Sequence, residues 1–358
     1  MLFEKDQVAK REDLLDLITR VDEKATPFMS LVNKGSTPQN TFIQWAVDSY
    51  ANPALGGTVD GTDVSSYANH AENRTLLSSY LQTFRKAYQV SRLAQEVSDV
   101  AGLGAGNEIA EASAKAGVEL VRNMEATLLS DQEHQVDNGS SNAYLLRGLG
   151  VWIRDSARLT TPGFGSVGGQ SLHPVDSNFL PAAGQVNGDP TADITESDIQ
   201  TMLQTIWSAT GMTGDYKLFA DATLRRAFTD FTRTIATAGY SQRNLNYDGD
   251  GTRISNTTTI FDGDFGSVEV IADNFIGFKD PAEGTTQEAG RGYLLDMDKI
   301  DLRVNKQPQI ERFEDKGGGE RFLIEGRAAL QVRNPIGLVS LLIMFQLHHK
   351  FLVFLIYY

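Results

Sequence analysis

The longest uninterrupted helical pattern in the chain, NEIAEASAKAGVELVRNMEATLLSD, runs from Asn107 to Asp131 and contains no proline. Asn107 is a favourable N-cap residue, because its side-chain oxygen accepts a hydrogen bond from an amide of the first helical turn. Apolar side chains recur at three- and four-residue steps, which places one stripe on a single face: Ile109, Ala112, Ala116, Leu120, Met124 and Leu128. At about 1.5 Å per residue this helix is roughly 36 Å long, enough to span a domain. The spacing alone also fits an ordinary core helix, so the neighbouring segments decide its meaning.

The composition is that of a globular protein with an acidic surface. The chain has 358 residues, which predicts two or three modules. It has no cysteine, which excludes disulfides and thiolate chemistry. Its net charge of −14 argues against a basic, nucleic-acid-binding face, but it is compatible with nucleic acid packed beside the protein. The N-terminal residues lack the apolar core of a signal peptide, so we expect no export.

The N-terminal third predicts an arm and a long two-stranded ribbon. Residues 11–21 have the pattern of a short amphipathic helix that must dock on its own or a neighbouring subunit. Strands are predicted at 40–49 and 74–91, joined by a Gly-, Asp- and Asn-rich stretch, 52–73. A two-stranded ribbon is marginal alone in water, so this element indicates a partner surface.

The second half predicts a mixed α/β module followed by returning strands. Residues 195–210 predict a helix that ends at Gly211, with its apolar face on Ile199, Met202, Leu203, Ile206 and Trp207. A strand at 216–220, a helix at 222–235 and strands at 257–261, 268–272 and 293–296 follow. Further strands are predicted at 300–304, 309–314 and 321–332, with Gly317, Gly318 and Gly319 making a hairpin of the last pair. The 151–294 block then reads as an insertion.

No catalytic, cofactor or metal motif emerges from the sequence. The five histidines are scattered and lack metal-ligand spacing. Gly163, Gly165 and Gly168 satisfy GxGxxG, but no helix follows them, as a dinucleotide site requires. Asp248 and Asp250 lie in a fragment of a calcium-loop pattern that lacks the closing glutamate, so a solvated turn is expected. We therefore predict no enzyme activity and no cofactor.

The order of elements resembles the major capsid proteins of tailed bacteriophages with the HK97-like fold. Several stretches look like the SU10-type major head proteins in particular: ATPFMSLVNKGS (25–36), FIQWAVDSYA (42–51), RTLLSSYLQTFRKAYQVS (74–91), GVELVRNMEATLLSD (117–131) and GDYKLFADATLRRAFTDF (214–231). Together they cover most of residues 11–335. The resemblance implies an α+β fold with an N-arm, an extended β-ribbon E-loop, a P-domain with a long spine helix, and an inserted A-domain.

The resemblance also implies a domain layout and a set of partners. We expect the N-arm at 1–35, the E-loop at 36–85, the P-domain at 86–150 and 295–335, and the A-domain at 151–294. The expected partners are many copies of the chain in pentamers and hexamers, with portal and scaffolding or decoration proteins. The shell, icosahedral or prolate, would be assembled in the host cytoplasm and enclose double-stranded DNA without sequence-specific binding. Contacts between subunits are expected from eight apolar side chains: Leu14, Ile18, Phe28, Trp45, Tyr50, Tyr67, Tyr80 and Phe84.

Two departures from the family pattern stand out. No lysine occurs between Gly35 and Arg85, so this E-loop cannot supply the lysine of the founding member's isopeptide cross-link. Residues 336–358 form an almost wholly apolar tail, for which packing under a neighbour or a sequence artefact is favoured over a membrane span, because His348, His349 and Lys350 interrupt it. A monomeric α/β enzyme or small-molecule binding protein, with a site in 151–193, is the alternative function.

Overall fold

A computed structural model describes residues 25–51, 53, 55–69, 71, 73–97, 108–153, 186–187, 196–237, 240–243, 246–247, 254–255, 260–278, 290–315 and 317–342. These residues fall into two compact units, each built from separate parts of the chain. One unit holds residues 84–123 and 306–326 with the N-terminal 25, and the other holds 26–83, 124–305 and 327–358. The predicted helix at 11–21, the glycine motif at 163–168 and the acidic turn at 248–250 lie outside the described residues.

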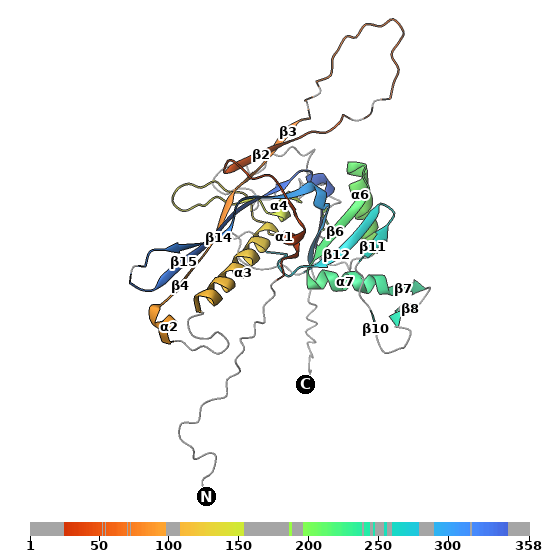
Figure 1. Cartoon of the computed structure of the whole chain (residues 1–358). Helices are drawn as coiled ribbons and strands as arrows, with labels where there is room; N and C mark the ends of the chain where they lie inside the picture. The colour runs from red at the N-terminus through yellow and green to blue at the C-terminus, as the bar shows by residue number, and fades with distance from the viewer. Residues whose placement is uncertain are drawn as a thin grey trace, which may run out of the picture. The chain divides into compact units, whose positions relative to one another are not determined.

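The predicted spine helix is present as α3 (Glu108–Leu128) (Figure 1). Its predicted apolar face is confirmed at Ala116, Leu120, Met124 and Leu128, which are all buried. The helix ends earlier than predicted, because the amide of Asp131 donates to the carbonyl of Phe278 instead of continuing the helical pattern. Asn107, the predicted N-cap, is outside the described residues.

The ribbon consists of β2 (Phe42–Val47) and β3 (Thr75–Tyr80), which pair antiparallel from Phe42↔Tyr80 to Val47↔Thr75. The prediction of one continuous strand over 74–91 is wrong. The chain breaks at Leu81, whose amide donates to the Thr41 carbonyl at 2.9 Å, and resumes as β4 (Gln82–Val90). The break has a physical reason: β3 bonds to β2, whereas β4 bonds to a different sheet, of order β1-β14-β15-β4.

That four-stranded sheet contains β1 (Asn33–Lys34), β14 (Ile300–Phe313) and β15 (Glu320–Val332). The separate strands predicted at 300–304 and 309–314 are in fact one strand, so that prediction is wrong. Pro308 lacks an amide hydrogen, but this is tolerated in a strand whose outer side pairs only at Asp301 and Leu302. The predicted hairpin between the last two strands is confirmed, since β14 and β15 are neighbours in the sheet.

A six-stranded sheet of order β11-β12-β6-β13-β16-β5 forms the core of the mixed module. Its strands are β5 (Val186–Asn187), β6 (Gly214–Ala220), β11 (Ile260–Gly263), β12 (Gly266–Ala272), β13 (Arg291–Leu295) and β16 (Val339–Leu342). Helices α6 (Glu196–Thr210) and α7 (Ala222–Arg233) pack on it (Figure 1). The predicted face of α6 is confirmed at Ile199, Met202, Leu203 and Ile206, but Trp207 remains 43% exposed.

Short elements complete the described fold: α1 (Pro27–Leu31), α2 (Arg92–Val97), α4 (Leu149–Trp152), β7 (Thr234–Thr237), β8 (Tyr240–Arg243), β9 (Asn246–Tyr247), β10 (Ile254–Ser255), η4 (Met297–Lys299) and η5 (Pro335–Gly337). The helix predicted at 222–235 stops at Arg233, because the next residues enter the β7–β8 hairpin. Gly211 ends α6 as predicted, with φ +69° and its amide donating to the Trp207 carbonyl.

The start of the predicted apolar tail belongs to the fold. β16 pairs antiparallel with β13 and parallel with β5, so these apolar residues complete a sheet within their own chain. Residues 343–358 lie outside the described residues. In the part of the chain that the structure describes, no helix is long and apolar enough to cross a membrane.

Candidate assembly surface

The root of the β2–β3 ribbon is fixed by one face of β2. The strand alternates, so Ile43 and Trp45 point inward while Gln44 and Ala46 are exposed. Ile43 packs with Leu81 and Ala329 in a small apolar cluster. The Trp45 indole donates to the Val332 carbonyl at 2.9 Å, and its ring lies 5.6 Å from that of Trp152. The alternation of β2 therefore anchors the ribbon at its base.

A buried ion pair lies beside this anchor. Arg147 is fully buried, and its Nε donates to Glu133 Oε1 at 2.7 Å. Its guanidinium carbon is 4.7 Å from the centroid of the Trp152 ring, and its backbone amide donates to Ser79 Oγ on β3. Burial lowers the pKa of Arg147, and the Glu133 carboxylate opposes that shift. A charge this deep is held only because its partner is in place.

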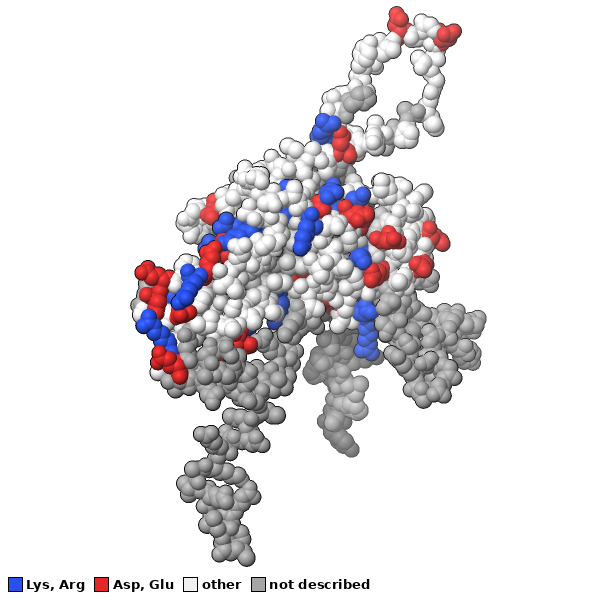
Figure 2. All heavy atoms as spheres, viewed as in Figure 1, with Lys and Arg blue, Asp and Glu red and all other residues white. Residues whose placement is uncertain are grey.

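Residues 48–74, the ribbon loop, extend from this root, and no other described part of the chain covers the described residues of the loop (Figure 1). Every described residue from Asp48 to Ala71 is exposed. The loop includes large apolar side chains that are 68–103% exposed: Tyr50, Leu55, Val59, Val64 and Tyr67. Figure 2 shows the loop as a bare string of residues with open space around it and acidic groups near its tip. Apolar side chains at this exposure gain free energy only when another surface covers them.

One short ion pair closes the base of the ribbon loop. Arg74 Nε lies 3.1 Å from Asp48 Oδ2, and Asn73 Nδ2 donates to the Ser49 carbonyl. Both partners of the ion pair are substantially exposed, so it contributes at most about 1 kcal/mol. These contacts hold the two ends of the loop together but leave its length unsupported.

The structure places six of the eight predicted contact residues. Tyr50 and Tyr67 are exposed on the ribbon loop, and Tyr80 is half-buried at the root, stacked on Tyr144 at 5.6 Å. Phe28 and Phe84 are buried within the chain itself. The Trp45 indole N–H donates to the Val332 carbonyl of the same chain. Leu14 and Ile18 lie outside the described residues.

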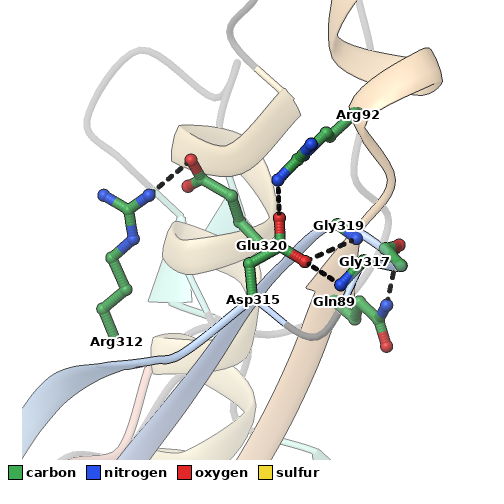
Figure 3. Close-up of polar contacts among 8 residues, drawn as sticks. Gln89, Arg92, Arg312, Asp315, Gly317, Gly319 and Glu320 are labelled. Atoms are coloured by element: carbon green, nitrogen blue, oxygen red, sulfur yellow. Dashed lines mark hydrogen bonds and ion pairs between the residues drawn. The ribbon is translucent and has the colours of Figure 1, made fainter.

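A second polar feature fixes the tip of the β14–β15 hairpin (Figure 3). Asp315 Oδ1 accepts from the amides of Gly317 at 2.7 Å and Gly319 at 3.3 Å, while Oδ2 pairs with Arg92 Nη2 of α2. These contacts, led by the Gly317 amide, lower the pKa of Asp315. Gln89 Nε2 of β4 donates to the Gly318 carbonyl at 2.9 Å. The tip is thus tied to β4 and α2 through groups that are far apart in sequence.

Sequence reasoning missed the polar groups that hold both features. Arg147, Glu133 and Gln89 stand in no repeating pattern, and their partners are 14 to 229 residues away. The exposed apolar residues of the ribbon loop were detectable, because they interrupt an otherwise polar stretch. Within the described ranges, no group of three or more His, Asp or Glu side chains could hold a metal ion.

The family model described as "SU10 major capsid protein" matches residues 3–342. The chain belongs to this family. The match ends where β16 ends, so residues 343–358 fall beyond the family's pattern. The family is a structural one, which excludes the alternative of a monomeric α/β enzyme.

Individual relatives agree with the family. The "Major capsid protein" of Escherichia phage Phieco32 is 30% identical over 132 residues, which is 36% of this chain and 35% of that protein. The present chain therefore matches only about a third of the length of that relative.

Solved structures support the HK97-like capsid fold. The "Cyanophage A-1(L) capsid asymmetric unit" gives a TM-score of 0.61 at 15% identity, covering 96% of this chain and 98% of that one. "Capsid of native GTA particle" gives 0.57 at 8% identity, covering 95% and 97%. Gordonia phage Cozz gives 0.54 at 11% identity, covering 93% and 90%. At these identities the likeness concerns the fold, and the predicted α+β fold class is confirmed.

Proposed function

We propose that this chain is the building block of a phage head, and that the ribbon loop binds a neighbouring copy during assembly. The observation that carries the second part is the exposure of five large apolar side chains on one unsupported loop. Membership of a capsid protein family supports the first part. Many copies, arranged as pentamers and hexamers, would form a closed shell around double-stranded DNA in the host cytoplasm.

The energetics favour many moderate contacts over a few strong ones. Covering a large apolar side chain stabilises a complex by about 1.5–3 kcal/mol. Five such side chains on each copy give a loop contact that is moderate after the cost of ordering the loop. In a closed shell each copy both donates and receives this contact, so the assembly is far more stable than any one interface.

The chemistry of the loop implies that this contact is non-covalent. It carries Asp60 and Asp63 and no lysine, so its own residues supply no amine for an isopeptide bond. Stability beyond the loop contact would come from decoration proteins, and scaffolding and portal proteins would direct closure. The acidic balance of the chain favours enclosure of DNA without sequence-specific binding, and no membrane has a role in this proposal.

The domain layout predicted from the family resemblance forms part of this proposal. The ribbon and its loop correspond to the E-loop, and the six-stranded sheet with α6 and α7 corresponds to the A-domain. β16 joins this sheet after residue 335, so in the proposed layout the last described strand returns to the A-domain.

Deletion of residues 52–73, with Ala51 and Arg74 joined by a short Gly-Ser turn, tests the assembly role. The subunit is expected to fold, because none of the described residues among those deleted is buried. Electron microscopy and sedimentation should show soluble subunits or small oligomers without complete shells. Complete shells of normal size from the deletion variant would contradict the role of the loop.

A pair of point variants separates the apolar contact from loop length. Tyr67→Ser removes a side chain that is 89% exposed and should raise the protein concentration needed for assembly by about tenfold or more. Thr62→Ser, in the same loop, leaves the large apolar side chains intact and should assemble like the parent. Equal assembly by both variants would count against a contact made through apolar side chains.

A further inference from the structure

Two buried carboxyl groups meet beneath α1 in the larger compact unit. Glu125, on α3, is fully buried, and Asp273, directly after β12, is 3% exposed. The two carboxyl groups are close enough that each influences the pKa of the other. Neither residue belongs to the ribbon root or to the hairpin tip, and the assembly proposal makes no use of them.

Glu125 caps α1 from a distance of almost one hundred residues in sequence. Its Oε1 accepts from the Phe28 amide at 2.7 Å and its Oε2 accepts from the Met29 amide at 2.9 Å. These are amides of the first turn of α1, where no intrahelical partner exists. Thr26, the N-cap residue, makes no side-chain capping hydrogen bond. Glu125 therefore supplies the acceptors for these two amides. Phe28 is itself buried and packs edge-on against Phe219 at 5.6 Å.

Asp273 is positioned by the end of the sheet. Its backbone amide donates to the Ala220 carbonyl at 2.9 Å, and its Oδ1 accepts from the Phe275 amide at 2.8 Å. Its Oδ2 is buried and receives no hydrogen bond from an N–H or hydroxyl donor of the described residues. An oxygen in this position, next to a second carboxyl group, is best satisfied by a proton held between the two acids.

The surrounding charges do not neutralise the pair. Among the described residues, no Lys, Arg or His forms an ion pair with Glu125 or Asp273. α1 carries no charged side chain. Two other buried acids of this unit have partners of their own. Asp221 accepts from the amides of Leu224 and Gly290, and Asp131 pairs with Arg291 at 2.6 Å.

Burial and like charge then act in the same direction. Burial first, and the Asp273 carboxyl second, raise the pKa of Glu125 to about 8, and burial raises the pKa of Asp273. Two adjacent carboxylates in such a site cannot both ionise at neutral pH without a large electrostatic penalty.

We propose that Glu125 and Asp273 share one proton and act as a latch that fastens Pro27–Leu31 to α3. Loss of the proton places two negative charges in the same buried site and weakens the attachment of α1. α1 follows residues 1–26 in the sequence, so in this proposal pH controls how firmly the chain is held at Pro27–Leu31.

Linkage gives the sign and the size of the effect. At neutral pH the latched form holds one proton. The opened form has already lost it, because its carboxyl groups have their ordinary pKa values. The opening equilibrium of α1 therefore rises about tenfold per pH unit between the ordinary and the raised pKa, and levels off above about pH 8.

Hydrogen exchange of the full-length protein between pH 5.5 and 9.5 tests the latch. Exchange at the amides of Phe28 and Met29 is followed by mass spectrometry and corrected for the base dependence of the exchange chemistry itself. The parent should lose protection by about tenfold per pH unit and then level off near pH 8. Peptides from β6 should show no such dependence, which separates latch opening from global unfolding.

Variants assign the effect to the carboxyl pair. Asp273→Asn places an amide donor opposite Glu125 at every pH and removes the second negative charge, so protection should remain high and depend on pH much less than in the parent. Glu125→Gln should abolish the pH dependence, but with lower protection throughout, because one of its two acceptor oxygens is replaced by a donor. Glu269→Gln, an exposed acid on β12 that pairs with Lys217, is the control and should behave like the parent.

Two results would overturn the proposal. One is protection at Phe28 and Met29 in the parent that does not change with pH after correction. The other is a pH dependence in Asp273→Asn that is as steep as in the parent. If Asp273→Asn fails to fold, the Glu125→Gln profile and the parent profile still decide the question.

Discussion

Replacing Arg147 with methionine should destabilise the subunit severely. The guanidinium is fully buried, and its Nε lies 2.7 Å from Glu133 Oε1, whose side chain is only 7% exposed. Methionine fills similar space beside Trp152 but removes the positive charge. The Glu133 carboxylate then loses its buried arginine and keeps its contacts with His134, whose backbone amide donates to Oε1 at 3.0 Å. Removing one partner of a buried ion pair costs about 3–5 kcal/mol. Since each 1.4 kcal/mol is a factor of ten, the ratio of folded to unfolded subunit should fall by at least about a hundredfold.

The double variant Arg147→Met/Glu133→Gln supplies the decisive comparison. It removes both charges, so most of the lost stability should return, and the double-mutant cycle should show a coupling of at least about 2 kcal/mol. Arg312→Met is the matched control for an exposed pair, because Arg312 lies 2.6 Å from Glu320 with a 65% exposed side chain. That control should cost no more than about 1 kcal/mol.

Urea unfolding of soluble subunits that lack residues 52–73 is the suitable assay, because assembly does not then interfere. Trp45 and Trp152 lie next to the pair and report its region by fluorescence. The midpoint should shift while the dependence on urea concentration, the m-value, stays constant. A loss of less than about 1 kcal/mol for Arg147→Met, or a double variant as unstable as the sum of the singles, would refute the reasoning.

Two further predictions concern the hairpin tip of Figure 3. Gly319→Ala should lower the urea midpoint more than Gly317→Ala. Both glycines have a positive φ, so both substitutions strain the backbone. In addition, a Cβ at Gly319 would lie 2.3 Å from the Val90 carbonyl oxygen, whereas a Cβ at Gly317 has no atom within 4 Å. Equal losses would argue against that steric contact. Because the folded pKa of Asp315 is lowered, its contribution to stability is present above its ordinary pKa and is lost as pH falls through the lowered value. The difference in urea midpoint between the parent and Asp315→Asn should therefore shrink below about pH 4, and a difference that is constant with pH would contradict this assignment.

Local sequence patterns were sufficient to predict those helices whose apolar residues repeat with helical spacing along the whole element. The buried face of α3 follows from apolar spacing alone, and so does most of α6, because a helix that must bury one stripe repeats every three to four residues. The ribbon also followed from alternation and a polar connection. The absence of lysine from the ribbon loop is a property of the sequence alone.

Only the tertiary structure decided where elements change partners. Nothing local in 74–91 marks Leu81, where the chain leaves β2 and joins β15, because strand propensity is equal on both sides of the break. β14 continues through Pro308 because that stretch lies at the edge of its sheet, a fact of topology. Glu125 occupies a position on α3 that sequence alone treats as an ordinary polar site, and its role depends on Phe28 and Asp273, 97 and 148 residues away. Burial and charge depend on what packs nearby, so the ion pair, the hairpin tip and the carboxyl latch became visible only in three dimensions.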